Sequence, residues 1–102
     1  MRIEAILQER LSNTFQPTLM EITNESYMHN VPANSETHFK VVLVSSKFAN
    51  SRKVARHQQV YALVGDLLEG ELHALALHLM TPEEWQQVGA APASPNCRGG
   101  DK

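Results

Sequence analysis

The chain has 102 residues, of which 42% are hydrophobic and 20% are charged, and its formal net charge is −2 at pH 7. These values are typical of a single globular domain that buries a core without disulfides or metals. They exclude a membrane-spanning segment, because no apolar run approaches the ~20 residues that a span needs. The net charge also argues against a protein that coats nucleic acid non-specifically.

The first segment has the periodicity of an amphipathic helix. Apolar side chains recur four residues apart at Ile3, Leu7 and Leu11, with polar residues between them. We predict a helix over residues 2–15 that ends before Pro17, because the residue before a proline disfavours the helical region. Acids interrupt this apolar pattern and no small-residue cleavage site follows it, so we do not expect a signal peptide.

Two strands and a long loop are predicted next. Residues 18–24 indicate a short strand, and residues 37–45 indicate the strongest strand of the chain, rich in β-branched and aromatic side chains. Residues 25–36 between them contain asparagine, proline and serine, which predict a loop. At about twelve residues this loop is longer than a hairpin connection needs, and such loops are often functional. It carries His29.

The middle of the chain is basic. After a turn at 46–51, an apolar three-four spacing predicts a second amphipathic helix over residues 53–69. Its proposed apolar side is formed by Val54, His57, Val60, Tyr61, Val64, Leu67 and Leu68. No acid lies between Glu36 and Asp66, where the bases are Lys40, Lys47, Arg52, Lys53 and Arg56. Bases at a helix start oppose the dipole, so they favour a partner outside the helix; the alternative is an ordinary solvated face.

The stretch HALALHLMTPEEW (73–85) combines a strand with a helix start. Alternation over 72–79 places His73 with three leucines on one face, and Leu72, two alanines and His78 on the other. Thr81, Pro82 and Glu84 then form an N-cap, a first-turn proline and a capping-box glutamate, which predict a helix over 82–88.

The predicted order is α-β-β-α-β-α. It indicates an α+β fold, a three-stranded mixed sheet with helices on one face, in which the first two strands pair antiparallel and the third runs parallel to the second. We predict one domain over residues 1–88. Residues 89–102 are rich in Gly, Ala, Pro and Ser without periodicity, and predict a disordered tail.

Five segments, in this order, resemble the BolA family: ESYMHNVPANSETHFKVVLVSSKF, RHQQVY, HALALH, TPEEW and SPNCRGG. The likeness runs from Ile3 to the tail. It implies a fold similar to the type II KH domain and a complex with a monothiol glutaredoxin, bridged by a [2Fe-2S] cluster. For the bacterial type it also implies transcriptional control of cell shape and stress response.

The chain departs from the family's pattern at three places. Asn50 stands where a glycine is usual, and asparagine also tolerates the left-handed backbone conformation. The sequence Arg56-His57-Gln58 replaces the common Arg-His-Arg and removes one base. The Gly-x-x-Gly loop with which KH domains clamp a nucleic-acid backbone is absent, so a KH-like fold does not imply KH-type RNA binding.

A metal site complete within this chain is not expected. A structural zinc site needs four ligands, whereas the chain has one cysteine, and His73 and His78 point to opposite strand faces. The resemblance implies instead that His73 and a loop residue, His29, bind a [2Fe-2S] cluster shared with a glutaredoxin cysteine and glutathione, and not held tightly by the isolated chain. Binding through neutral imidazoles would weaken as the pH falls.

Each histidine also has a purely structural interpretation. His73 can be a satisfied strand-edge residue, and His29 a solvated loop residue. We expect His38 and His57 to pack or to form hydrogen bonds.

Two functions follow from these observations. The first is an iron–sulfur adaptor, monomeric alone and heterodimeric with its glutaredoxin. The alternative is a transcriptional regulator that binds promoter DNA through Arg52, Lys53, Arg56 and Lys47 at the start of the second helix. No catalytic constellation is recognisable, so we do not expect an enzyme.

The single cysteine, Cys97, cannot form an internal disulfide, which predicts a reducing compartment and a cytoplasmic location by default. In a mobile tail it would be open to oxidation or glutathionylation, or else inert.

Overall fold

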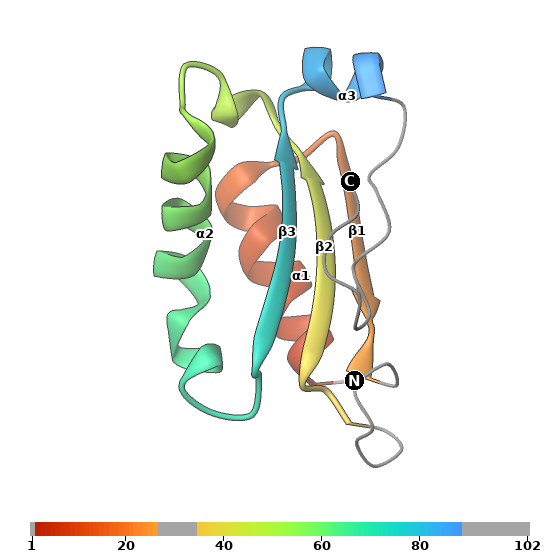
Figure 1. The fold of residues 1–102 in the computed structure, drawn as a ribbon, viewed down its shortest axis with the longest axis vertical. Helices are drawn as coiled ribbons and strands as arrows, with labels where there is room; N and C mark the ends of the chain where they lie inside the picture. Colours follow the sequence, from red (N-terminus) through yellow and green to blue (C-terminus); the bar gives the residue numbers. More distant parts are fainter. Residues whose placement is uncertain (1, 27–34, 89–102) are drawn as a thin grey trace.

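In Figure 1 the first helix lies behind a three-stranded sheet, the second helix lies beside the third strand, and a short third helix lies at one end of the sheet. The computed structural model describes residues 2–26 and 35–88. The helices and strands, in chain order, are α1 (Arg2–Phe15), β1 (Leu19–Asn24), β2 (His38–Val44), α2 (Lys53–Leu68), β3 (Ala74–Met80) and α3 (Pro82–Val88). A 3-10 turn over Ser46–Phe48 connects β2 to α2. No helix in the described ranges is long and apolar enough to cross a membrane.

The sheet has the predicted topology. Its strand order is β1-β2-β3, with β1 antiparallel and β3 parallel to the central β2. The predicted α+β class, the order of the elements and the mixed sheet are therefore confirmed. The predicted bounds of α1 are also correct, and those of α2 and the first two strands lie within one residue of the observed ones.

The core lies between the helices and one face of the sheet. Helix α1 buries its predicted apolar stripe, and α2 adds three apolar side chains from the other side. Along β2, the alternate residues Phe39, Val41 and Leu43 face these helices and are at most 1% exposed. Arg10 ties the two helices together, because its guanidinium donates to both carboxylate oxygens of Asp66 at 2.6 and 3.1 Å.

Strand β3 begins two residues later than predicted. The expected strand started at residue 72, but β3 starts at Ala74, and residues 72 and 73 belong to the connection from α2. The predicted alternation consequently failed for Leu72. It was placed on the face of His78, yet it is fully buried, and its N–H donates to the Leu67 carbonyl at 3.1 Å.

The buried side of α2 also differs from the predicted one. Val54 and Tyr61 were assigned to the apolar side but are 70% and 39% exposed. The buried residues are Arg56, Val60, Val64 and Leu67. The three-four spacing of the prediction was correct, but the true stripe includes an arginine, which its charge had argued against.

The β2–α2 turn depends on a left-handed residue. Asn50 has φ +67°, in the region that disfavours most side chains. The prediction that asparagine can replace the usual glycine there is confirmed.

The base of the predicted 25–36 loop is anchored on both sides, although residues 27–34 lie outside the described ranges. Ser26 Oγ accepts hydrogen bonds from the N–H groups of Thr37 at 2.9 Å and His38 at 3.2 Å. The Glu36 carboxylate accepts from the N–H groups of Ile3 and Glu4, both at 3.2 Å, and so caps α1 from a distant part of the chain.

Candidate functional site

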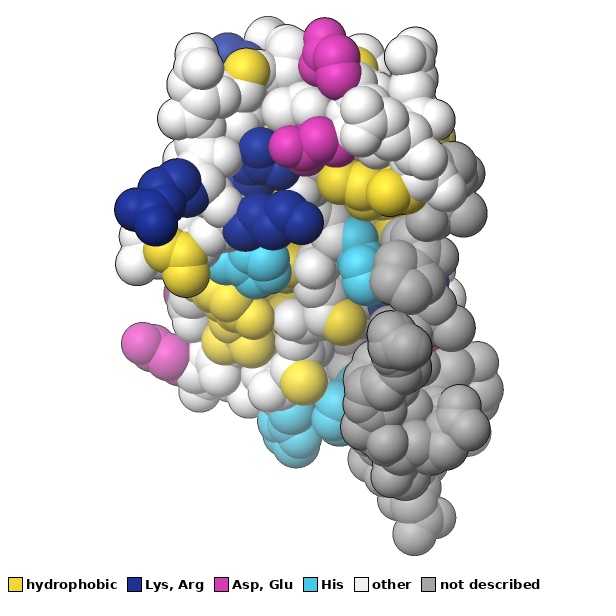
Figure 2. All heavy atoms as spheres, turned by 45° about the horizontal axis from the view of Figure 1, so that its top comes forward, with side chains coloured by type: hydrophobic (Ala, Val, Ile, Leu, Met, Phe, Trp, Pro, Cys, Tyr) yellow, Lys and Arg dark blue, Asp and Glu magenta, His cyan; other side chains and the backbone are white. Residues whose placement is uncertain are grey.

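The first candidate surface is the start of α2. Arg52 and Lys53, together with Lys47 in the preceding turn, are exposed, and we call these three residues the α2 basic cluster. Figure 2 shows lysine and arginine side chains gathered on this side of the molecule. Arg52 occupies the N-cap position and makes no side-chain capping bond. The first-turn N–H groups therefore add partial positive charge to the cluster.

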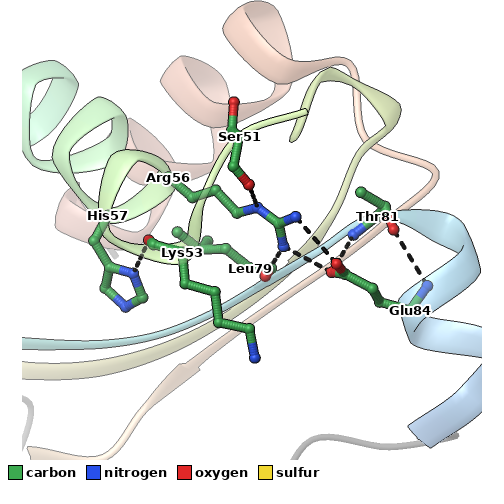
Figure 3. A network of polar contacts seen from close by, with 7 residues as sticks. All are labelled: Ser51, Lys53, Arg56, His57, Leu79, Thr81 and Glu84. Atoms are coloured by element: carbon green, nitrogen blue, oxygen red, sulfur yellow. Dashed lines mark hydrogen bonds and ion pairs between the residues drawn. The ribbon is translucent and has the colours of Figure 1, made fainter. Parts of the chain in front are cut away.

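Arg56, the fourth predicted DNA contact, is in a different environment. It is 5% exposed, and its guanidinium reaches three partners from three parts of the chain (Figure 3). Nε donates to the Ser51 carbonyl at 3.0 Å, and NH1 donates to the Leu79 carbonyl at 3.1 Å. The two terminal nitrogens also donate to Glu84, at 2.7 and 3.1 Å.

Glu84 has two functions in this network. The predicted capping box is present, because Glu84 accepts from the Thr81 N–H at 3.0 Å and donates its own N–H to Thr81 Oγ1 at 3.2 Å. The same carboxylate pairs with Arg56. The hydrogen bond from Arg56, followed by the one from the Thr81 backbone, lowers the pKa of Glu84 to about 2.

The structure argues against the prediction that Arg56 contacts DNA. A guanidinium that is buried and bonded to two carbonyls and a carboxylate has no face to offer a phosphate. The helix dipole disfavours the positive charge of Arg56 in the first turns of α2, and the carboxylate of Glu84 in α3 compensates for it. Lys53, in the same first turn of α2, is exposed and points away from this network (Figure 3). It stays with Arg52 and Lys47 as a predicted contact.

Two histidines lie next to the α2 basic cluster. His57 Nδ1 is 2.9 Å from the Lys53 carbonyl, and because a carbonyl only accepts, Nδ1 donates this bond. His78 is half-buried on the face of the sheet away from the helices. Burial lowers the pKa of His78, and the charges of Lys40 and His57 lower it further, whereas the charge of Glu25 raises it.

The second candidate site surrounds His73, which is exposed and immediately precedes β3. Its backbone is fixed, because the Thr37 carbonyl accepts from the N–H groups of His73 at 2.8 Å and Ala74 at 3.1 Å. The His73 ring meets the ring of His38 edge-on, with centroids 5.9 Å apart. His38 Nδ1 is hydrogen-bonded to Thr37 Oγ1 at 2.8 Å, so it is a satisfied histidine as predicted.

The anchored loop base and His73 meet at Thr37. Ser26 receives the N–H of Thr37, and the carbonyl of Thr37 receives the N–H of His73. The described ends of the segment that carries His29 are thus tied directly to the backbone of His73. His29 itself and Cys97 lie outside the described residues, as does the predicted 89–102 tail.

Within the described ranges, no group of three or more His, Cys, Asp or Glu side chains could hold a metal ion. An exposed imidazole on a fixed backbone nevertheless fits one position of a shared ligand set, because histidine can replace cysteine on one iron of a [2Fe-2S] cluster. The sequence alone did not reveal that His38 lies beside His73. Their contact follows from the β2–β3 register, in which His38 is opposite Ala74.

Comparisons with known proteins agree closely. A family model described as BolA-like protein matches residues 11–84. The DNA-binding transcriptional regulator BolA of Vibrio cholerae is 48% identical over 98% of this chain and 95% of its own length. The protein of the same name from Escherichia coli is 47% identical over 97% of this chain and 95% of its own. The solution structure of mouse BolA1 superposes with a TM-score of 0.81 at 39% identity, covering 95% of this chain and 79% of that one.

Proposed function

The chain belongs to the BolA-like protein family, and from that premise we propose that it is a DNA-binding transcriptional regulator whose α2 basic cluster contacts the phosphate backbone. The names of the Vibrio and Escherichia relatives support this proposal, since both chains are covered almost completely. The structural observation that carries it is the exposure of Lys47, Arg52 and Lys53 around an N-cap without a side-chain acceptor.

This arrangement suits a phosphate. Helix N-termini bind anions through free N–H groups and the dipole, and flexible cations beside them add salt-dependent affinity. Such contacts position a protein on DNA without reading bases. The paired Arg56 contributes indirectly, because it holds the end of β3 and the first turn of α3 against the start of α2.

Replacing the α2 basic cluster should remove most of the DNA affinity. We expect Lys47→Ala/Arg52→Ala/Lys53→Ala to reduce the slope of log affinity against log salt by about 2–3, since each lost phosphate contact accounts for about 0.9. Fluorescence anisotropy with a labelled promoter-length duplex across a salt series measures this slope.

Two single variants that lose the same charge distinguish the effect of a cation's position from the effect of net charge. Arg52→Ala and Arg2→Ala each remove one positive charge, but Arg2 pairs with Glu71, far along the chain from the cluster. Only Arg52→Ala should weaken binding. Equal losses in the two variants, or a triple variant with the wild-type slope, would contradict the proposal.

A second candidate function is supported by the His73 site. We propose that the chain also binds a monothiol glutaredoxin through a shared [2Fe-2S] cluster, with His73 as one ligand and His29 as the expected second. The supporting observation is that an exposed imidazole is tied through Thr37 to the base of the loop that carries His29. A neutral imidazole would supply nitrogen to one iron, and the partner and glutathione would supply the thiolates.

Mixing the protein with a cluster-loaded monothiol glutaredoxin should change its visible absorption and circular dichroism. We expect His73→Ala to abolish this change, because one of the two ligands that the chain provides is lost. Gln59→Ala, an exposed change on α2, is the control and should behave as wild type. Identical spectra for the wild type and His73→Ala would refute the ligand assignment.

A further inference from the structure

We propose that the DNA surface extends from the α2 basic cluster across β3 to Lys40, and that His57 and His78 on this path make its affinity for the phosphate backbone depend on pH. This inference rests on the proposed DNA binding and adds its regulation. It concerns two histidines that belong neither to the proposed [2Fe-2S] site at His73 nor to the hydrophobic core.

The register of the sheet places His78 and Lys40 close together on one face. His78 is opposite Val42, and Ala76 is opposite Lys40, so His78 and Lys40 lie on the same face of adjacent strands, two positions apart along them. The helices cover the other face, to which Phe39, Val41 and Leu43 point. Figure 2 shows histidine side chains directly beside the lysine and arginine group.

His57 connects the sheet to α2. Its Nδ1 donates to the Lys53 carbonyl, so the neutral ring has its free lone pair on Nε2. Protonation at Nε2 therefore adds a charge without breaking the bond that orients the ring. Figure 3 shows that His57 and Lys53 both point away from the Arg56 network. A protonated His57 would thus extend the cationic surface rather than compete with Glu84.

The charges around His78 favour its neutral form in the free protein. Burial lowers the pKa of His78, Lys40 on β2 and His57 on α2 act in the same direction, and Glu25, which follows β1, opposes them. Glu21 of β1 shares the row of His78 through Val42, but two strand spacings separate them. Of the two acids in the first turn of α3, Glu84 is engaged by Arg56, and neither acts on the pKa of His78.

A phosphate backbone reverses this balance. Lys40, His57 and His78 repel one another when all are charged, and a polyanion over the three groups replaces that repulsion by attraction. DNA binding should therefore take up protons, and affinity should rise as the pH falls through the histidine range. A duplex supplies regularly repeated phosphates, which suits a path that continues from a helix start across a strand.

The test is DNA affinity as a function of pH at constant ionic strength. With the full chain and a short fluorescein-labelled duplex, we expect affinity to rise up to about tenfold between about pH 7.5 and about pH 5.5. The double variant His57→Gln/His78→Gln should keep the affinity measured at the higher pH and lose most of the rise. Gln59→Ala, an exposed change on α2 that removes no titratable group, should retain it.

The outcomes separate this inference from the proposed function. If the wild type does not bind the duplex at any pH, the proposed DNA binding itself fails. If it binds, and the rise in affinity persists unchanged in the double variant, only the proposed effect of His57 and His78 on the affinity is overturned. NMR titration of the His78 imidazole gives an independent readout, because its pKa should increase when DNA is added if the inference is correct, and stay constant if it is not.

Discussion

Glu84→Ala is expected to destabilise the domain by about 3 kcal/mol, although the residue lies in a short surface helix. The change removes both carboxylate oxygens from an Arg56 side chain that is only 6% exposed. It also removes the acceptor for the Thr81 N–H. Because Glu84 is itself 41% exposed, water can partly replace it, so the loss should be smaller than for a fully buried pair. Denaturant unfolding followed by circular dichroism measures it.

The neighbouring glutamate provides the control. Glu83 is exposed and occupies the same first turn of α3, so Glu83→Ala tests the effect of the helix dipole alone and should cost less than about 0.5 kcal/mol. Glu84→Gln keeps one acceptor and the cap, and should fall between the two. Equal losses for Glu83→Ala and Glu84→Ala would show that the Arg56 pair contributes nothing measurable.

The Arg56–Glu84 pair also predicts how the free energy of unfolding depends on pH. The pKa of Glu84 is lowered to about 2 in the folded protein, below the 4.5 of an unperturbed glutamate. A carboxyl whose pKa is lowered by folding contributes stability that is present above its unfolded value and disappears as the pH falls through its folded value. The difference in unfolding free energy between the wild type and Glu84→Gln should therefore be constant above about pH 4.5 and shrink towards about pH 2.

The local signals of the sequence predicted the fold well. Pro17 marks the end of α1 and capping residues mark the start of α3, and the periodicity of each segment separates helices from strands. Asn50 was also predicted correctly, since the BolA family usually carries a glycine at this turn and asparagine tolerates the same left-handed conformation. These features depend on residues within a few positions of one another, so they can be recognised without the tertiary structure.

The misassignments all required tertiary information. Arg56 lies four residues before Val60 and eight before Val64, so its position in the pattern indicated the core, while its charge indicated the surface. Only its contact with Glu84, on another helix, decides between them. Glu84 already had a complete local explanation as a capping residue, which concealed its second function. Likewise, the approach of His38 to His73 depends on strand register, which the sequence did not fix.

Phe48→Ala should have the other large effect, a loss of about 3–5 kcal/mol. Phe48 is fully buried in the turn before the α2 basic cluster, and its ring centroid lies 5.0 Å from that of Phe15. The central carbon of the Arg56 guanidinium lies 5.8 Å from the same ring. Truncation therefore leaves a cavity and removes the aromatic face on which a buried cation rests. Phe48→Leu, which fills most of the volume, should cost clearly less.

Thermal and denaturant unfolding measure these losses, and Val54→Ala, at a position that is 70% exposed, should remain close to wild type. A loss below about 1 kcal/mol for Phe48→Ala would mean that the turn collapses onto the cavity without cost. Phe48 and Glu84 both contact Arg56, from the ring side and the carboxylate side. Their combined change should therefore differ from the sum of the single changes, because either one already disturbs the arginine that the other supports. Strict additivity would imply that Arg56 does not couple the β2–α2 turn to α3.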